Sequence, residues 1–212
     1  MRHVVAPIVE GDCEVKCLPV LLHRIWTELL GQPSLLVLNP SRTKRQLVAD
    51  IPKGELQRKL DESSVRLKQK LGTDSRGAIL LLLDADNDCP VHVAAKLRTA
   101  AQLRPGFSFI CVIAKRMFEN WIVAGASSLC GVSSLPDDLE LPPNPESCNG
   151  AGWLDGQIRR TNPARKYDKI VDSVTFVRQM NLDDARQMSP SFDKLCRDLK
   201  NWVCGSDAPS TP

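Results

Sequence analysis

Short apolar runs alternate with amphipathic segments along the first 126 residues of the chain. Four apolar runs, each ended by polar or turn-forming residues, predict strands over 4–9, 35–38, 78–83 and 107–114. Apolar residues at helical spacing predict helices over 12–30, 54–71, 91–103 and 116–124. The run 78–83 lacks polar alternation, which is typical of a central strand covered on both faces. Strands that alternate with helices in this way predict an α/β domain with a mainly parallel central sheet flanked by helices.

The pattern changes after residue 126. Residues 127–158 contain prolines and acidic residues but no lysine or arginine, which predicts an irregular loop or lid. A basic cluster and helices over 166–180 and 191–203 then predict a helical extension of the fold. We therefore expect an α/β core over 1–126, a loop over 127–158, a C-terminal helical extension over 159–204 and a disordered tail over 205–212.

Composition excludes several classes of protein. The 212 residues include 28 Lys and Arg against 25 Asp and Glu, so a net charge of +3 excludes a histone-like polycation. No run of about 18 apolar residues predicts a membrane span, and Glu10 comes too early for a signal-peptide core. We therefore expect a cytoplasmic protein whose eight cysteines stay reduced. Because no Cys-x-x-Cys pair occurs, the cysteines are interpreted as small buried hydrophobes rather than zinc ligands.

Acidic residues gather where three of the predicted strands end. In open α/β sheets, ligands bind beyond the carboxyl ends of the strands. The acidic residues near these ends are Glu10, Glu14, Asp84, Asp86, Asp88 and Glu119. Converging carboxylates repel one another, and a bound divalent cation removes that cost. Hard oxygen ligands without paired cysteines favour Mg²⁺ or Mn²⁺, whose natural use is phosphodiester chemistry. The alternative interpretation is that these acids cap helices or lie in solvated turns.

Two of these acidic segments resemble a known fold. Ile8-Val9-Glu10-Gly11-Asp12-Cys13-Glu14 and Leu82-Leu83-Asp84-Ala85-Asp86 resemble the Toprim fold of topoisomerases, bacterial primases and the OLD (overcoming lysogenisation defect) nucleases. Three further segments narrow the resemblance: Ile113-Ala114-Lys115-Arg116-Met117-Phe118-Glu119-Asn120-Trp121, Tyr167-Asp168-Lys169 and Ser189-Pro190-Ser191-Phe192. Over nearly the whole chain, the sequence resembles the Toprim-like family called domain of unknown function 4276 and, more distantly, the OLD-type nucleases.

The resemblance implies a role for each acid. Glu10 matches the Toprim glutamate, and Asp84 and Asp86 match its Asp-x-Asp pair. Glu14 matches the second acid of the nuclease-type first motif, and Glu119 matches a downstream acid. The expected catalytic residues are therefore Glu10, Glu14, Asp84, Asp86 and Glu119. The expected ligands of Mg²⁺ or Mn²⁺ are Glu10, Asp84, Asp86 and Asp88.

A phosphodiester substrate also needs cations that position its backbone. The candidates for binding nucleic acid are Lys115, Arg116, Arg159, Arg160, Arg165, Lys166 and Lys169. Residues Arg42, Lys44 and Arg45 form a further basic segment. The alternative for each cation is an exposed helix face, where it is simply solvated.

The leading expectation is metal-dependent hydrolysis of nucleic acid by a Toprim-like nuclease. No phosphate-binding loop of the P-loop type occurs, so the resemblance implies a separate ATPase subunit and a role in bacterial defence against phage. Two alternatives stay open: a nucleotidyl transferase, and a non-catalytic subunit that binds an ATPase or nucleic acid. The sequence leaves the oligomeric state open, a homo-oligomer included.

Overall fold

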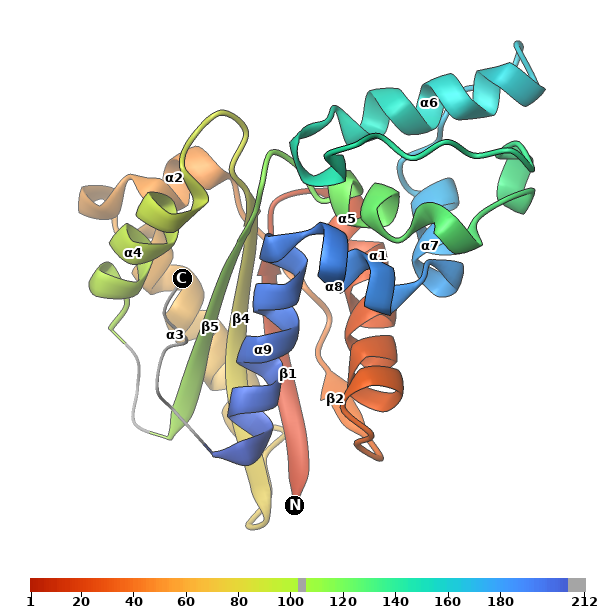
Figure 1. Ribbon diagram of the computed structural model, residues 1–212. Coiled ribbons are helices and arrows are strands. Elements are labelled where there is room, and N and C mark those ends of the chain that lie inside the picture. Colours follow the sequence, from red (N-terminus) through yellow and green to blue (C-terminus); the bar gives the residue numbers. More distant parts are fainter. Residues whose placement is uncertain (103–105, 206–212) are drawn as a thin grey trace.

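A computed structural model describes residues 1–102 and 106–205, and this part of the chain contains a parallel five-stranded sheet. The strands are β1 (Arg2–Val9), β2 (Leu35–Val37), β3 (Ser41–Arg42), β4 (Ser75–Asp84) and β5 (Phe107–Ala114). Their order is β2-β1-β4-β5, and the short β3 also pairs with β1 (Figure 1). The four strands expected from the apolar runs are confirmed, as is the parallel α/β fold. Only β3, which consists of two polar residues, gave no apolar signal.

Nine α-helices occur in the described residues. They are α1 (Asp12–Arg24), α2 (Arg45–Ala49), α3 (Glu55–Lys68), α4 (Pro90–Ala100), α5 (Glu119–Ala124), α6 (Gly150–Thr161), α7 (Val171–Gln179), α8 (Leu182–Met188) and α9 (Pro190–Cys204). A π-helical segment, Ile25–Leu29, continues α1, and short 3-10 turns occur at Ile51–Lys53, Ala126–Ser128, Val132–Ser134 and Pro145–Ser147. No helix in the described residues is long and apolar enough to cross a membrane.

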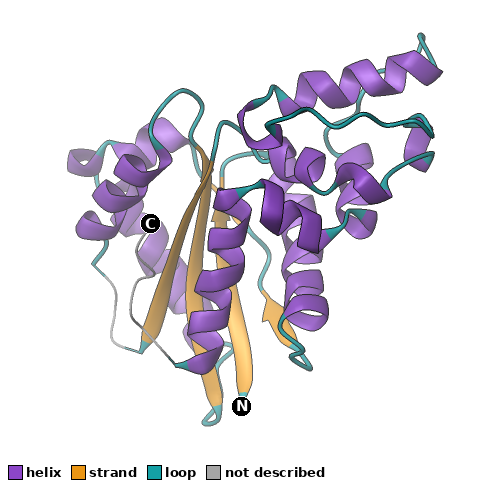
Figure 2. Ribbon diagram, viewed as in Figure 1, coloured by secondary structure: helices purple, strands orange, loops and turns teal. Residues whose placement is uncertain are grey.

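Alternation along the strands sends side chains to two separate cores. In β1, Val5 and Val9 face the helices α1, α5 and α9, whereas Val4 and Ile8 face α3 on the other side. Figure 2 shows the sheet between these helical layers. A continuous apolar strand such as β4 is buried because both of its faces are covered, as the lack of polar alternation predicted.

The C-terminal helices belong to the same core as α1 and α5. Phe176 of α7, Phe192 of α9 and Trp121 of α5 are all fully buried in one hydrophobic cluster. Helix α5 is buried over its whole length, since Glu119–Ala124 are each at most 4% exposed. The C-terminal extension therefore packs around α5 and fixes the segment that follows β5.

Three expected boundaries differ from the structure. The irregular segment ends earlier than residue 158, because α6 begins at Gly150, with the Asn149 side chain accepting the N–H of Gly152. Its three glycines weakened the helical signal, and burial of Leu154 and Ile158 compensates. Helix α7 begins at Val171 rather than 166, after an ordered loop. Helix α4 ends at Ala100 rather than at residue 103. The expected tail beyond residue 205 lies outside the described residues.

Candidate metal and phosphate site

Three strand ends bring acidic side chains to one edge of the sheet. Glu10 directly follows β1, Asp84 is the last residue of β4, and Glu119 opens α5 shortly after β5. Glu14 joins them from the first turn of α1. Because β1, β4 and β5 are adjacent and parallel, their carboxyl ends meet at the same edge. We call Glu10, Glu14, Asp84 and Glu119 the acidic cluster.

Glu14 is folded back over the start of its own helix. Its side chain is buried, and a Cβ placed on Gly11 would lie 2.6 Å from Glu14 Oε2. The absence of a side chain at Gly11 leaves room for this placement of the carboxylate. Burial raises the pKa of Glu14, and the negative charges of Glu119 and Glu10 raise it further. The glycine of the first motif thus has a direct role in directing an acid toward the cluster.

Asp84 interacts electrostatically with the other three acids of the acidic cluster. Burial, followed by the charges of Glu14, Glu119 and Glu10, raises its pKa to about 8. The backbone N–H of Phe118 donates a hydrogen bond to this carboxylate and opposes the shift. The other oxygen, Oδ1, is buried and has no hydrogen-bond partner. A buried carboxylate in this state favours either a proton or a cation.

Glu119 has a cation beside it. Its side chain is 5% exposed, and Lys169 Nζ lies 3.2 Å from Glu119 Oε1. Lys169 stands in the loop between α6 and α7, far from Glu119 in sequence. The ammonium offsets part of the negative charge at this edge, because it also lowers the pKa of Glu14. Lys169, which the sequence analysis assigned to substrate binding, therefore forms an ion pair with an acid of the acidic cluster.

The remaining two acids of the Asp-rich segment pair with Arg45 at the start of α2. Arg45 Nη2 lies 3.0 Å from Asp88 Oδ2 and 3.6 Å from Asp86 Oδ2. Its Nη1 donates to the backbone oxygen of Ala85 at 2.6 Å, and its backbone N–H donates to Glu10 Oε1 at 3.4 Å. Arg45 thus joins the ends of β1 and β4, and it neutralises two carboxylates outside the acidic cluster.

A pocket of about 460 Å³ opens beside this arginine. It is lined by Arg45, Asp86, Asn87, Asp88, Arg116 and Met117. Asp86 and Arg116 both have left-handed backbone conformations, with φ of 51° and 66°, and Asp86 N–H donates to Arg116 O at 3.0 Å. A left-handed arginine costs about 1 kcal/mol or more, and such strain is concentrated at functional sites. Two arginines and two aspartates thus line the same pocket, and Arg116 Nη1 also donates to the backbone oxygen of Ser147 at 2.9 Å.

The described residues show both fit and misfit to a divalent cation. Glu10 Oε2 and Asp84 Oδ1 are buried oxygens without hydrogen-bond partners, as expected of side chains that would hold a cation. Yet among residues 1–102 and 106–205, no three side chains of the His, Cys, Asp or Glu type are close enough, as placed, to hold a metal ion. Carboxylates that carry like charge stay apart until a cation offsets their repulsion. These hard oxygen donors suit Mg²⁺ or Mn²⁺, and Glu10 and Asp84 are the residues that would hold the ion.

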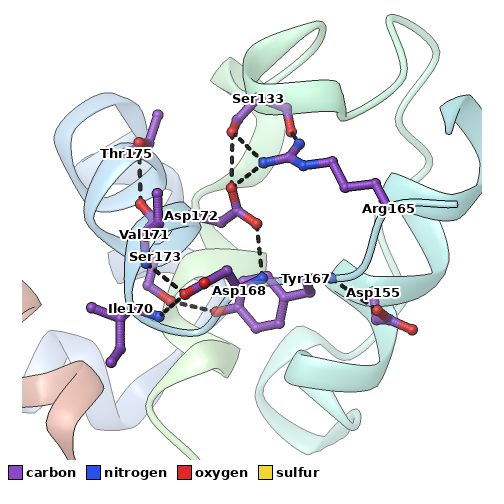
Figure 3. A network of polar contacts seen from close by, with 10 residues as sticks. All are labelled: Ser133, Asp155, Arg165, Tyr167, Asp168, Ile170, Val171, Asp172, Ser173 and Thr175. Carbon is purple, nitrogen blue, oxygen red and sulfur yellow. Dashed lines mark hydrogen bonds and ion pairs between the residues drawn. The ribbon is translucent and has the colours of Figure 1, made fainter.

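The expected substrate-binding cations divide into two groups. Arg159 bonds to Asp155, Arg160 to Asp138 and Arg165 to the buried Asp172, so these three have carboxylate partners within the protein. Lys166 is exposed, Lys115 lines a separate groove of about 600 Å³ between α4 and α9, and Arg116 lines the pocket beside Arg45. Figure 3 shows Arg165 and Asp172 within a network that braces the loop before α7.

Two residues that build the edge gave no clear signal in the sequence. Asn120 is fully buried, and its side-chain amide donates to the backbone oxygens of Glu146 and Cys148. Its Oδ1 accepts the N–H of Gly150, where a Cβ would lie 2.5 Å from that oxygen. Buried Glu146 in turn accepts the N–H of Ser191 at 2.6 Å at the start of α9. The sequence does not distinguish the buried Glu146 from the solvated acids of the same proline-rich loop.

A comparison with protein families confirms the expected family, domain of unknown function 4276. The family model described as Domain of unknown function (DUF4276) matches residues 9–200. The chain therefore belongs to this family, and the match includes all of the acidic cluster. No curated protein and no solved structure matches the chain.

Proposed function

We propose that this protein is a metal-dependent phosphodiesterase that cleaves nucleic acid, a nuclease of the Toprim-like type. The observation that carries the proposal is the convergence of Glu10, Glu14, Asp84 and Glu119 from three strand ends, with two buried carboxylate oxygens left without a partner. Each of these acids costs free energy when it is charged and buried, and no structural need of the sheet explains four together. Such an arrangement is typical of a site that binds a divalent cation.

The residues of the chain have separable tasks in this proposal. Glu10 and Asp84 would hold the Mg²⁺ or Mn²⁺ ion through their free oxygens, and the ion supplies charge stabilisation at the phosphoryl oxygens. Arg45 and Arg116 would position the phosphate backbone from the adjacent pocket. Glu14, a buried member of the acidic cluster, would orient the attacking water and accept its proton as the P–O bond to the leaving oxygen breaks.

The partner is proposed from the resemblance to OLD-type nucleases. Those proteins combine a Toprim domain with an ATPase, and this sequence has no P-loop motif. We therefore propose that a separate ATPase subunit acts with this chain, in bacterial defence against phage.

One observation favours a non-catalytic subunit instead. As placed, no three potential ligand residues in the described parts of the chain are arranged to hold a metal ion. A subunit that only binds an ATPase or nucleic acid would keep the fold without needing that arrangement. Metal-dependent cleavage by the isolated chain separates the two functions.

The test is incubation of the purified chain with single- and double-stranded DNA and RNA in Mg²⁺ or Mn²⁺, with and without a chelator. The proposal predicts cleavage of at least one substrate that depends on the metal and stops with the chelator. Binding of these substrates without cleavage of any of them would support the non-catalytic subunit.

A further inference from the structure

Lys169 reaches the acidic cluster from the surface. Its side chain is 61% exposed, whereas that of its partner Glu119 is 5% exposed. Water can stabilise the charge of the exposed ammonium, whereas the buried carboxylate relies on the ammonium to stabilise its charge. Burial lowers the pKa of Lys169, but the charge and hydrogen bond of Glu119 raise it, and the charge of Asp84 adds a smaller contribution, so that the pKa is raised overall. One lysine thus interacts electrostatically with several acids at this edge.

The backbone around Lys169 is fixed by hydrogen bonds on both sides. Before it, the N–H of Tyr167 donates to Asp155 Oδ1 at 2.9 Å, and the N–H of Asp168 donates to Asp172 Oδ2 at 2.9 Å (Figure 3). After it, the N–H groups of Ile170 and Val171 both donate to the Asp168 side chain. Lys169 itself is therefore presented by an ordered loop, although it lies outside regular structure.

Side chains anchor the same loop to the core. The hydroxyl of Tyr167 bonds to Ser173, and its ring stacks on Phe176 at a centroid distance of 6.4 Å. Asp172, which is 1% exposed, pairs with Arg165 and accepts the hydroxyl of Ser133. A loop held in this way places the ammonium of Lys169 over Glu119 as a property of the fold.

The ion pair between Lys169 and Glu119 divides the acidic cluster into acids with and without a cation beside them. The oxygens without partners belong to Glu10 and Asp84, at the ends of the neighbouring strands β1 and β4. Glu119, by contrast, already has a cation at 3.2 Å, and that cation also acts on Glu14. A second divalent ion bound at Glu119 would be repelled by the ammonium, which lies 3.2 Å from Glu119 Oε1.

We propose that Lys169 takes the place of a second metal ion, so that the site binds one divalent cation at Glu10 and Asp84 while the ammonium neutralises Glu119 and Glu14. This inference rests on the proposed function, because it assumes that the acidic cluster binds a metal. It deepens that function by giving the site one divalent ion and one fixed ammonium. Lys169 is on this account a positioning residue for the acids rather than a ligand of the substrate.

The test is a titration of the full chain with Mn²⁺, in which free Mn²⁺ is followed by electron paramagnetic resonance at constant ionic strength. We expect one bound Mn²⁺ per chain for the wild type and for Lys169→Arg. We expect two for Lys169→Met, because the acids released from the ammonium become available. Lys166→Met, which removes the same charge from an exposed neighbour, is the control and should bind one.

Two results overturn the inference while leaving the proposed function intact: two ions on the wild type, or one ion on folded Lys169→Met. Binding of no Mn²⁺ by the wild type contradicts the proposed function itself, and the inference with it. Glu119→Gln gives a second test if Lys169→Met does not fold. It should still bind one ion, since Glu119 is paired with lysine rather than metal, and loss of that ion overturns the inference.

Discussion

The guanidinium of Arg45 lies 3.0 Å from the carboxylate of Asp88 and joins the start of α2 to the end of β4. The same side chain donates to the backbone oxygen of Ala85 and is 15% exposed. Arg45 therefore acts as a structural link between two strand ends, in addition to lining the pocket proposed to receive phosphate. Its neighbours Asp86 and Asp88 are more than 60% exposed, so water screens the carboxylate contacts.

Replacement of this arginine should cost stability mainly through the backbone contact. We expect Arg45→Met to lower the free energy of unfolding by about 1–3 kcal/mol, because a charged donor to a partly buried carbonyl is lost. Arg58→Met is the matched control, since Arg58 also has two carboxylate partners but is 54% exposed. Its loss should cost less than the loss of Arg45, because water screens both of its ion pairs. Urea unfolding of both variants measures the difference, and equal costs would mean that Arg45 is only a surface cation.

Asp84 should make the stability of the metal-free protein depend on pH. Its pKa is raised to about 8 in the folded chain, above the value of 3.8 for an unburied aspartate. The folded state therefore binds the proton more tightly, and stability rises as the pH falls from about 8 toward 4, by up to about 1.4 kcal/mol per pH unit. Asp84→Asn removes this contribution and should be at least as stable as the wild type above pH 8.

Unfolding in urea with a chelator, at about pH 6 and pH 9, measures this effect as the difference between the two proteins. Titrating groups outside the acidic cluster contribute equally to both proteins, so the difference reports Asp84 together with the groups coupled to it. A large loss of stability in Asp84→Asn at pH 9 would show that the carboxylate has a structural role as an ion, contrary to the electrostatics of the acidic cluster.

Two adjacent cations near the C-terminal helices should behave differently when replaced. Arg165 pairs with Asp172, which is 1% exposed, so Arg165→Met leaves a buried charge and should cost about 3 kcal/mol. Lys166 is exposed, so Lys166→Met should change stability by less than about 0.5 kcal/mol. If Lys166 contacts a phosphate, its loss should weaken nucleic-acid binding and reduce the salt slope of log K by about 1. Thermal melts and salt-dependent binding assays measure the two effects, and the reverse pattern would contradict these assignments.

The sheet could be predicted because its strands are apolar without interruption. A run such as 78–83 has no polar face, and burial on both sides of a parallel sheet is the arrangement that such a run requires. The edge that carries the acids followed from the same logic, since Glu10 and Asp84 directly end their strands. Once strand order is fixed by parallel crossovers, the convergence of these two residues is set by the topology.

The division of the charges could not be predicted in the same way. Nothing in the spacing of Arg45 or Lys169 indicates that the first pairs with Asp88 and the second with Glu119, because both contacts depend on long-range packing. Arg165 was grouped with substrate-binding cations for the same reason, although its partner Asp172 is buried. The identity of a charged residue is visible in the sequence, but its partner is a property of the tertiary structure.

The most direct test of the proposed hydrolysis compares cleavage by the wild type, Asp84→Asn and Asp74→Asn on the substrate that the wild type cleaves best in Mn²⁺. Asp74 directly precedes β4, is 76% exposed and pairs with the N-terminal ammonium of Met1. Asp74→Asn therefore makes the same chemical change at the amino end of the strand whose carboxyl end carries Asp84. The account predicts that Asp74→Asn cleaves at the wild-type rate, while folded Asp84→Asn loses at least about 100-fold, since a metal ligand supplies several kcal/mol of charge stabilisation. Cleavage by Asp84→Asn at the wild-type rate would contradict it.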